Sequence, residues 1–167
     1  MPRPQPAGSD TVASLSERLL HQATCVAIGG RAVLIEGPPG AGKSGLALAL
    51  IDRGAVLVGD DGVALERRGD ALWSRPPANI RGMLEARNLG LLTFPTTEAP
   101  VALRLVLDPD APRFVEAAAR AMIAGVPIPS LRFDPRIAPA PMRAELALRT
   151  YGLPGVSGGL PADRNHR

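Results

Sequence analysis

The chain of 167 residues has few aromatic side chains and a single cysteine. Phe, Trp and Tyr make up only 3% of the residues whereas apolar residues make up 46%, so a buried core must be built from Leu, Val, Ile and Ala. Cys25 cannot form a disulfide within the chain, and its apolar neighbours favour a buried, unreactive thiol. The scarcity of aromatic side chains also removes the platforms on which single-stranded nucleic acids stack.

Long apolar runs are absent as well. No run approaches the roughly 18 residues that a membrane-spanning helix needs, and Met1–Pro6 is too polar and proline-rich for a secretory signal. We therefore expect a soluble, cytoplasmic protein with no membrane partner. The net charge of +3 comes from scattered arginines, which fit phosphate ligands or an acidic protein partner as well as nucleic acid. With so few aromatic residues, we expect no nucleic-acid partner.

The most specific motif of the chain is a phosphate-binding loop. Its pattern, G-x-x-x-x-G-K-[ST], is fulfilled by Gly37-Pro38-Pro39-Gly40-Ala41-Gly42-Lys43-Ser44. Residues 32–35 predict a buried strand before the loop, and residues 46–51 predict a helix after it that ends near Gly54. In this context the glycine-rich backbone and the helix N-terminus surround a polyphosphate, Lys43 contacts the terminal phosphates, and the Ser44 hydroxyl is a Mg²⁺ ligand.

Two adjacent carboxylates follow the next predicted strand. Residues 55–58 predict a short buried strand, and Asp60 and Asp61 stand at its carboxyl end, where α/β folds bind their ligands. Adjacent carboxylates repel each other unless a cation or a proton separates them. In a phosphoryl-transfer enzyme one carboxylate helps to hold Mg²⁺ and the other takes the proton of the attacking hydroxyl. The alternative is an ordinary turn over residues 59–62.

The rest of the chain predicts a mixed α/β sheet in one domain. Glycine turns and β-branched segments indicate strands, whereas helical spacing indicates helices. The expected strands lie at 24–28, 31–35, 63–66, 71–73, 88–94 and 101–107. The expected helices lie at 114–124 and 142–148, with a helical turn ending at Leu20, a short helix or turn at 79–87, and an irregular proline-rich segment at 127–135. We expect a disordered lead over 1–13, a P-loop domain over 14–152 and a flexible tail over 153–167.

Three further polar residues are candidates for the same site. His21 precedes the first predicted hairpin, so it either lies on the surface or reaches the sheet edge where it orients Asp61. Glu85 and Arg87 are two residues apart and share a face if they lie on a strand. They form either a solvated charge pair or contacts to metal and phosphate.

Together these motifs resemble the catalytic domain of HPr kinase/phosphorylase, in a short form that comprises only this domain. Residues 53–61 are similar to the family's R-G-H-x-L-V-A-D-D, at the same distance from Lys43. Residues 84–90 resemble its L-E-I-R-G-L-G signature, and Leu20-His21 resembles its upstream H-G pair. The resemblance covers residues 20–94, roughly half of the chain, and generic P-loop ATPases do not combine these motifs at these distances.

The resemblance implies a P-loop-containing mixed β-sheet flanked by helices, with a phosphoenolpyruvate-carboxykinase-like nucleotide-binding core. It implies an ATP- and Mg²⁺-dependent serine kinase that phosphorylates an HPr-type phosphocarrier of a phosphotransferase system, and hexameric assembly. Some members also remove the phosphate with inorganic phosphate. The implied residue roles are Asp61 as acid/base, Lys43 on the transferred phosphate, Ser44, Asp60 and Glu85 near Mg²⁺, and His21 beside Asp61.

The chain departs from the family in places that keep other functions open. The family's late P-V-[KR]-P-G-R-N motif, tied to dephosphorylation, has no clean equivalent, and residues 129–136 occupy its region. Arg113 and Arg132 are both candidates for the functional arginine expected before it. One alternative is a small-molecule or phosphoenolpyruvate-carboxykinase-like kinase, and another is a nucleotide-sensing regulator without phosphoryl transfer. Phosphorylation of an acceptor serine distinguishes the kinase from the sensor.

Overall fold

The computed structural model describes residues 18–79 and 81–155, which contain two helices and eleven strands. The helices are α2 (Lys43–Asp52) and α3 (Ala140–Tyr151). The strands are β1 (Arg18–His21), β2 (Thr24–Ile28), β3 (Arg31–Glu36), β4 (Val56–Gly59), β5 (Val63–Arg68), β6 (Ala71–Arg75), β7 (Met83–Ala86), β8 (Gly90–Thr93), β9 (Ala99–Leu107), β10 (Ala119–Ile123) and β11 (Val126–Phe133).

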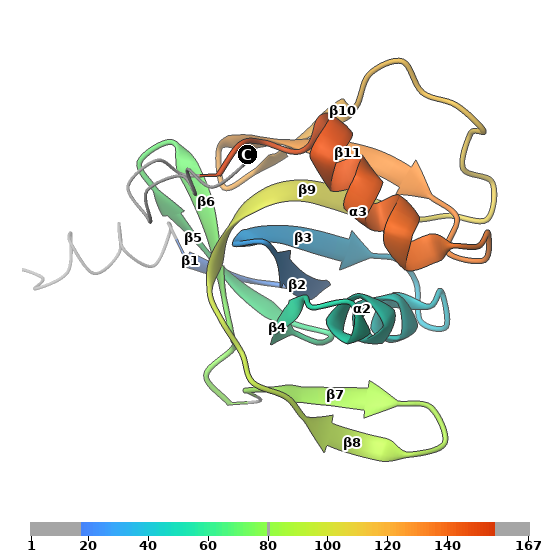
Figure 1. Ribbon diagram of the computed structural model, residues 1–167. Helices are drawn as coiled ribbons and strands as arrows, with labels where there is room; N and C mark the ends of the chain where they lie inside the picture. Colours follow the sequence, from blue (N-terminus) through green and yellow to red (C-terminus); the bar gives the residue numbers. More distant parts are fainter. Residues whose placement is uncertain (1–17, 80, 156–167) are drawn as a thin grey trace, which may run out of the picture.

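Nine of the strands form one curled sheet, and β7 and β8 form a separate hairpin below α2 (Figure 1). The main order is β1-β5-β6-β9-β3-β2-β4, and β11 continues from β9 with β10 at its side. β9 runs parallel to β3 and β11, whereas the other pairs in the sheet are antiparallel. This arrangement confirms the predicted mixed sheet, because local hairpins give antiparallel pairs and only crossover connections give parallel ones.

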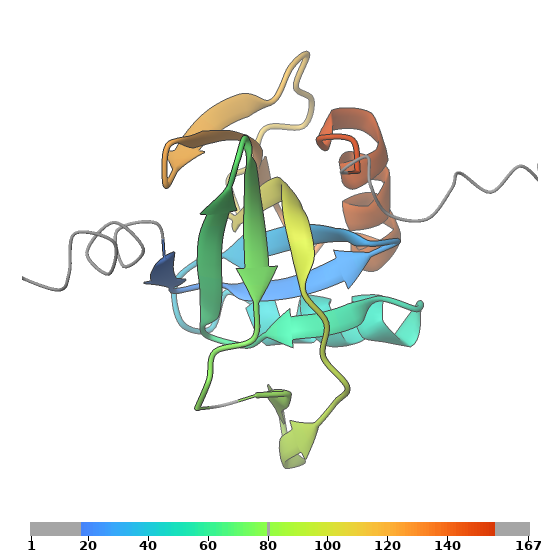
Figure 2. The ribbon, with the colours of Figure 1, turned by 90° about the vertical axis from the view of Figure 1, so that its left-hand side faces the viewer.

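The sheet separates two hydrophobic cores. Strand β3 illustrates this, because its side chains alternate between the two faces. Val33 and Ile35 face a helix-side core that also includes residues of α2 and α3, whereas Ala32 and Leu34 face a second core between the curled halves of the sheet. Figure 2 shows β5 and β6 lying across the face of the sheet opposite to α2. All four side chains are fully buried, and burying Leu or Ile contributes about 1.5–3 kcal/mol each.

The strand–loop–helix unit predicted around the phosphate-binding loop is present. β3 leads into the loop, and α2 follows it directly. The helix ends as the glycine stop predicts: Gly54 has φ +109°, and the N–H of Ala55 bonds to the carbonyl of Leu50. This left-handed glycine closes the last helical turn and directs the chain into β4.

The predicted helix over residues 114–124 is wrong. Residues 119–123 form β10, which pairs with β11 through a two-residue turn at Ala124 and Gly125, both with positive φ. Val115 packs against the helix-side core, whereas Ile123 is buried in the second core, so the apolar side chains do not share one helical face. The tight turn and the pairing with β11 outweigh the helical spacing.

The prediction of an irregular segment over residues 127–135 is also wrong, because most of it belongs to β11. Pro127 and Pro129 alternate with the buried residues Val126 and Ile128, so the prolines occupy the outer face. β11 pairs with β9 only from Ser130 onward, and the proline-bearing half therefore has a strand neighbour on one side only. Proline is tolerated at such positions because no ladder hydrogen bond is required on the open side.

Two shorter predictions need correction as well. Residues 83–86, expected as part of a short helix or turn, form strand β7, whose side chains Leu84 and Ala86 are buried under α2. Residues 18–20, expected to end a helical turn, lie in β1 and pair with β5. The remainder of that predicted turn falls outside the described residues. In the described ranges, neither helix is long and apolar enough to cross a membrane.

Candidate active site

The phosphate-binding loop joins the carboxyl end of β3 to the N-terminus of α2 (Figure 1). Gly42 is the N-cap residue of α2, has φ +102°, and offers no side chain that would cap the helix. The first helical turn contains no acidic residue, so its N–H groups and partial positive charge stay available to an anion. Pro38 and Pro39 have no N–H, and the N–H of Ala41 bonds to the carbonyl of Pro38, which leaves the N–H groups of Gly40 and of Gly42 onward as donors to phosphate.

The side chain of Lys43 folds back over the phosphate-binding loop. Its Nζ donates to the carbonyl oxygen of Gly37 at 2.6 Å, and it is the only lysine among the 167 residues. Gly37 is closely surrounded, because a Cβ at this position would lie 3.1 Å from the Cβ of Ala41 and 3.2 Å from that of Leu107. The loop therefore packs against the end of β9 and keeps the ammonium group beside the cradle of N–H groups.

Asp60 is the point at which the predicted site residues meet. Its Oδ1 accepts hydrogen bonds from the hydroxyl of Ser44 at 2.7 Å and from the hydroxyl of Thr24 at 2.9 Å. Its Oδ2 accepts from the backbone N–H of Glu85 at 3.2 Å. All three donors are neutral, so they fix the carboxylate in place, and within residues 18–79 and 81–155 no ion pair with a cationic side chain compensates its charge.

An irregularity in the sheet directs Asp60 toward α2. Cys25 pairs with Gly59 and Val26 pairs with Leu57, so Val58 is an additional residue in β4. Regular alternation would place Asp60 on the face of Val58, which lies in the second core. The bulge shifts the alternation by one residue, and Asp60 consequently faces Ser44 at the start of α2.

Asp61 differs from its neighbour in backbone and exposure. It is exposed, has φ +55°, and its N–H bonds to the hydroxyl oxygen of Thr24 at 3.4 Å. The turn is tight, because a Cβ on Gly59 would collide with the carbonyl oxygen of Gly62. A non-glycine residue in the left-handed region is uncommon and costs about 1 kcal/mol, although Asp tolerates it better than most residues. The turn thus separates two adjacent carboxylates, one held inward and one presented outward.

His21 contacts a different carboxylate from the one that the sequence suggests. Its Nε2 donates to Glu36 at 3.1 Å, and among the described residues no hydrogen bond joins it to Asp61. Arg104 binds the same carboxylate with two nitrogens, at 2.8 and 3.1 Å, and donates to the hydroxyl of Ser130. Burial by itself raises the pKa of Glu36, but the hydrogen bonds from His21 and Arg104 outweigh it and hold that pKa below its ordinary value.

Among the described residues, the side chains of the remaining sequence candidates make no hydrogen bond to Asp60. Arg132 pairs with Asp108 at 2.7 Å, where the ends of β9 and β11 meet beside the loop. Arg87 and Arg113 are exposed. Glu85 is exposed and reaches Asp60 only through its backbone N–H.

Sequence reasoning missed three residues of this region: Thr24, Glu36 and Arg104. Thr24 carries no motif signal. Glu36 directly precedes the loop, and Arg104 is a charged residue inside an apolar run, which signals a buried partner.

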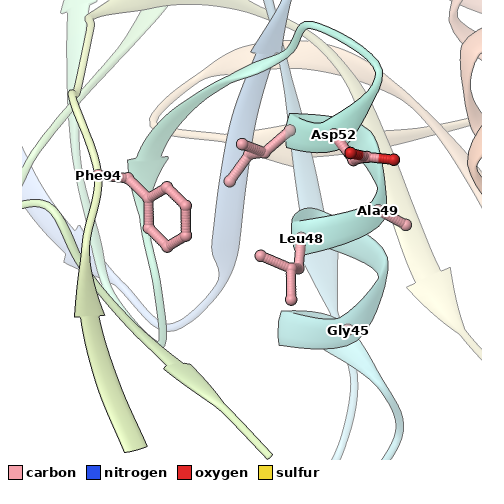
Figure 3. A pocket seen from close by; sticks show the side chains of 6 residues that line it. Gly45, Leu48, Ala49, Asp52 and Phe94 are labelled. Carbon is pink, nitrogen blue, oxygen red and sulfur yellow. The ribbon is translucent and has the colours of Figure 1, made fainter. Parts of the chain in front are cut away.

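An open pocket of about 530 Å³ lies along α2 on the side of the β7–β8 hairpin. Figure 3 shows Phe94, which follows β8, facing Leu48 of the helix across this space. The lining residues are Gly45, Leu48, Ala49, Ile51, Asp52 and Phe94. None of them belongs to the loop or to the acidic pair, so the pocket is not the phosphate site.

The donor set suits Mg²⁺ bound together with a nucleotide. Within residues 18–79 and 81–155, no group of three or more His, Cys, Asp and Glu side chains is arranged to hold a metal ion. Mg²⁺ usually takes one or two carboxylates together with substrate phosphates and water, and it does not need such a cage. Asp60 and the Ser44 hydroxyl, 2.7 Å apart at the start of the loop helix, supply ligands of this kind.

Comparison with known proteins fits this geometry. The family described as "HPr Serine kinase C-terminal domain" matches residues 13–97, which is half of the chain and includes the loop, the acidic pair and β7. The chain belongs to this family. HPr kinase/phosphorylase from Nitrosomonas europaea is 46% identical over 76 residues, which cover 45% of this chain and 24% of the relative. The corresponding protein from Chromobacterium violaceum is 48% identical over 73 residues, covering 43% and 23%.

The fold extends the family relationship beyond the matched sequence. The structure of the Hpr(Ser) kinase/phosphatase from Coxiella burnetii has a TM-score of 0.69 and 27% sequence identity, and the similarity covers 78% of this chain and 88% of that chain. It confirms the predicted fold class. The chain nevertheless spans only about a quarter of the length of the relatives that it matches.

Proposed function

We propose that this chain is an ATP- and Mg²⁺-dependent serine kinase that phosphorylates an HPr-type phosphocarrier protein. The observation that carries the proposal is the 2.7 Å hydrogen bond between the Ser44 hydroxyl and Asp60. It joins the last residue of the phosphate-binding loop to the first of two adjacent carboxylates, as Mg²⁺-assisted phosphoryl transfer requires. The relatives named HPr kinase/phosphorylase and the Coxiella burnetii Hpr(Ser) kinase/phosphatase support the same activity.

In this proposal the two aspartates have different roles, Asp60 in binding metal and Asp61 in accepting a proton. Asp60 and Ser44 would hold Mg²⁺, which would neutralise charge on the phosphates. Asp61 takes the proton from the acceptor serine hydroxyl while that oxygen attacks the γ-phosphorus and the bond to ADP breaks. Lys43 stabilises the negative charge on the transferred phosphoryl group. The exposed position of Asp61 suits a proton acceptor that must meet a protein substrate.

The further sequence predictions belong to the same proposal. Glu85 is assigned to the metal side of the site, since its strand contacts Asp60. His21 is assigned to the Asp61 side, and Arg87, Arg113 and Arg132 are candidates for contacts to phosphate or acceptor. The proposal includes a hexameric assembly and a cytoplasmic location. Light scattering of the purified protein measures the oligomeric state directly.

The test is the mass of the carrier after incubation with Mg·ATP and the purified protein. One added phosphate is expected with the native chain, and Asp61→Asn should lower the rate about 10²–10⁴-fold while nucleotide affinity is retained. Asp70→Asn, which removes the same charge from the exposed β5–β6 turn, is the matched control and should act at the native rate. Undiminished transfer by Asp61→Asn would exclude it as the proton acceptor.

Two further outcomes separate the alternatives. Nucleotide binding without phosphorylation of any HPr-type carrier would favour the sensor function over the kinase. Release of phosphate from the phosphorylated carrier on addition of inorganic phosphate would add the phosphorylase activity. Lys43→Ala does not distinguish these alternatives, because loss of this lysine abolishes nucleotide-dependent chemistry in many P-loop proteins.

A further inference from the structure

Among the described residues, Thr24 is the one whose side chain forms hydrogen bonds with both members of the acidic pair. It is the first residue of β2, and its side chain is fully buried although it carries a hydroxyl group. A buried hydroxyl needs hydrogen-bond partners, because desolvation without them costs free energy. The partners of Thr24 are the carboxylate of Asp60 and the backbone N–H of Asp61.

The sheet register explains why Thr24 reaches Asp60. Cys25 pairs with Gly59 beyond the bulge in β4, so the next residues outward, Thr24 and Asp60, lie opposite each other. Val26, two residues after Thr24, faces the helix-side core, and Thr24 therefore points to the same face, toward α2. The bulge brings Asp60 onto this face, where the two hydroxyls of Thr24 and Ser44 converge on one carboxylate oxygen.

The hydroxyl has the donor and acceptor capacity for both bonds. Its one proton is donated to Asp60 Oδ1 at 2.9 Å, and its lone pairs accept the N–H of Asp61 at 3.4 Å. The second bond anchors the residue whose φ is +55° and whose side chain is exposed. The first bond comes from β2 and not from the phosphate-binding loop, so it does not compete with the metal-ligand role assigned to Ser44.

We propose that Thr24 is a positioning residue that holds Asp60 against Ser44 and anchors the turn that presents Asp61. This proposal rests on the proposed function for its effect on phosphoryl transfer, whereas its effect on Asp60 is independent of any acceptor protein. Thr24 touches neither nucleotide nor acceptor in this scheme and acts through the two aspartates.

The experiment compares Thr24→Val, which removes the hydroxyl and keeps the shape, with Thr24→Ser, which keeps the hydroxyl. ADP affinity is measured by calorimetry with EDTA and with Mg²⁺, and carrier phosphorylation gives kcat and KM. We expect Thr24→Val to bind ADP in EDTA like the native protein, to lose about tenfold or more of the Mg²⁺-dependent gain in affinity, and to lower kcat by about 10–100-fold. Thr24→Ser should restore both quantities to within about threefold of native values.

Ser74→Ala is the matched control for losing a buried hydroxyl. Ser74 is also fully buried and donates to the carbonyl of Ala99 at 2.8 Å, between β6 and β9. It should lower the melting temperature as Thr24→Val does, but it should leave the Mg²⁺-dependent gain and kcat unchanged. If Thr24→Val does not fold, Thr24→Cys replaces it, because a thiol fills the site and is a weak hydrogen-bond donor.

Two results would overturn the proposal. The first is an unchanged Mg²⁺-dependent gain and an unchanged kcat in Thr24→Val or Thr24→Cys. The second is a Thr24→Ser variant as impaired as Thr24→Val, which would assign the effect to the methyl group. A native protein that phosphorylates no carrier, combined with a loss of the Mg²⁺-dependent gain in Thr24→Val, would refute the proposed function and retain the positioning of Asp60.

Discussion

Two carboxylates near the phosphate-binding loop are held in opposite ways. Asp60 receives three hydrogen bonds from neutral donors, two hydroxyls and one backbone N–H. Glu36 receives its hydrogen bonds from Arg104 and His21, and its side chain is only 16% exposed. Neutral donors fix a carboxylate without cancelling its charge, whereas a bidentate arginine does both. The difference indicates that Asp60 is ready for a cation and that Glu36 is part of the scaffold.

Among the variants that compare these two carboxylates, the largest effect should come from removing the charge of Asp60. Asp60→Asn keeps the shape of the side chain, but it should reduce the Mg²⁺-dependent gain in ADP affinity at least about tenfold and phosphoryl transfer about 100-fold. Glu36→Gln is the matched variant and should leave the Mg²⁺-dependent gain unchanged. Calorimetry with and without Mg²⁺ measures both. Equal losses in the two variants would contradict the division between a cation site and a scaffold.

A smaller effect, on stability, should come from removing Arg104, the main partner of the Glu36 carboxylate. Arg104→Leu leaves Glu36 without its main partner, and we expect a loss of about 2 kcal/mol, less than the roughly 3–5 kcal/mol of fully buried pairs because both side chains retain some solvent contact. Combining Arg104→Leu with Glu36→Leu should restore at least half of the loss, since no unpaired charge then remains.

The control for this variant is Arg53→Leu, which breaks a more exposed pair with Glu145. Its cost should stay below about 1 kcal/mol. Thermal and urea unfolding measure all of these variants. An equal loss in Arg53→Leu and Arg104→Leu would mean that burial does not decide the value of these pairs.

The smallest effect is expected on how the free energy of unfolding depends on pH. The pKa of Glu36 is lowered in the folded protein, so its contribution is fully present above its unfolded pKa of about 4.3 and is lost as the pH falls through the lower folded value. Glu36→Gln should therefore show a flatter fall in unfolding free energy between about pH 5 and pH 3. Asp108 and Asp134 also have lowered pKa values, but they are present in both proteins and cancel in the difference. Identical slopes in the two proteins would contradict this role.

The parts of the fold that the sequence predicts are local. The loop, the following helix and the hairpins at Gly29-Gly30 and Gly69-Asp70 each depend on residues close together in the chain, and all are present. The wrong predictions, the helix at 114–124 and the irregular segment at 127–135, concern β10 and β11. β10 pairs only with β11, and β11 joins the sheet by pairing with β9. That pairing joins residues 20 or more positions apart, such as Arg104 and Ser130, and local propensity does not determine it.

The residues of the candidate site also fall into those that the sequence identifies and those that it does not. The motif residues Lys43, Ser44 and Asp60 are identifiable because their chemistry requires those residue types at that spacing. Thr24 is not identifiable, because its relation to Asp60 depends on the sheet register and on one additional residue in β4. The contact of His21 with Glu36 is likewise not predictable, because it joins β1 to the end of β3.

The single lysine gives this protein a chemical property of its own. Apart from an α-amino group, Lys43 is the only amine in these 167 residues that an acylating reagent can modify, and it lies on the loop proposed to bind the nucleotide phosphates. Intact-mass spectrometry therefore registers one mass increment from the α-amino group and one from the loop, and nucleotide should protect only the loop. The extent of the loop increment, followed against nucleotide concentration, becomes a titration of the site.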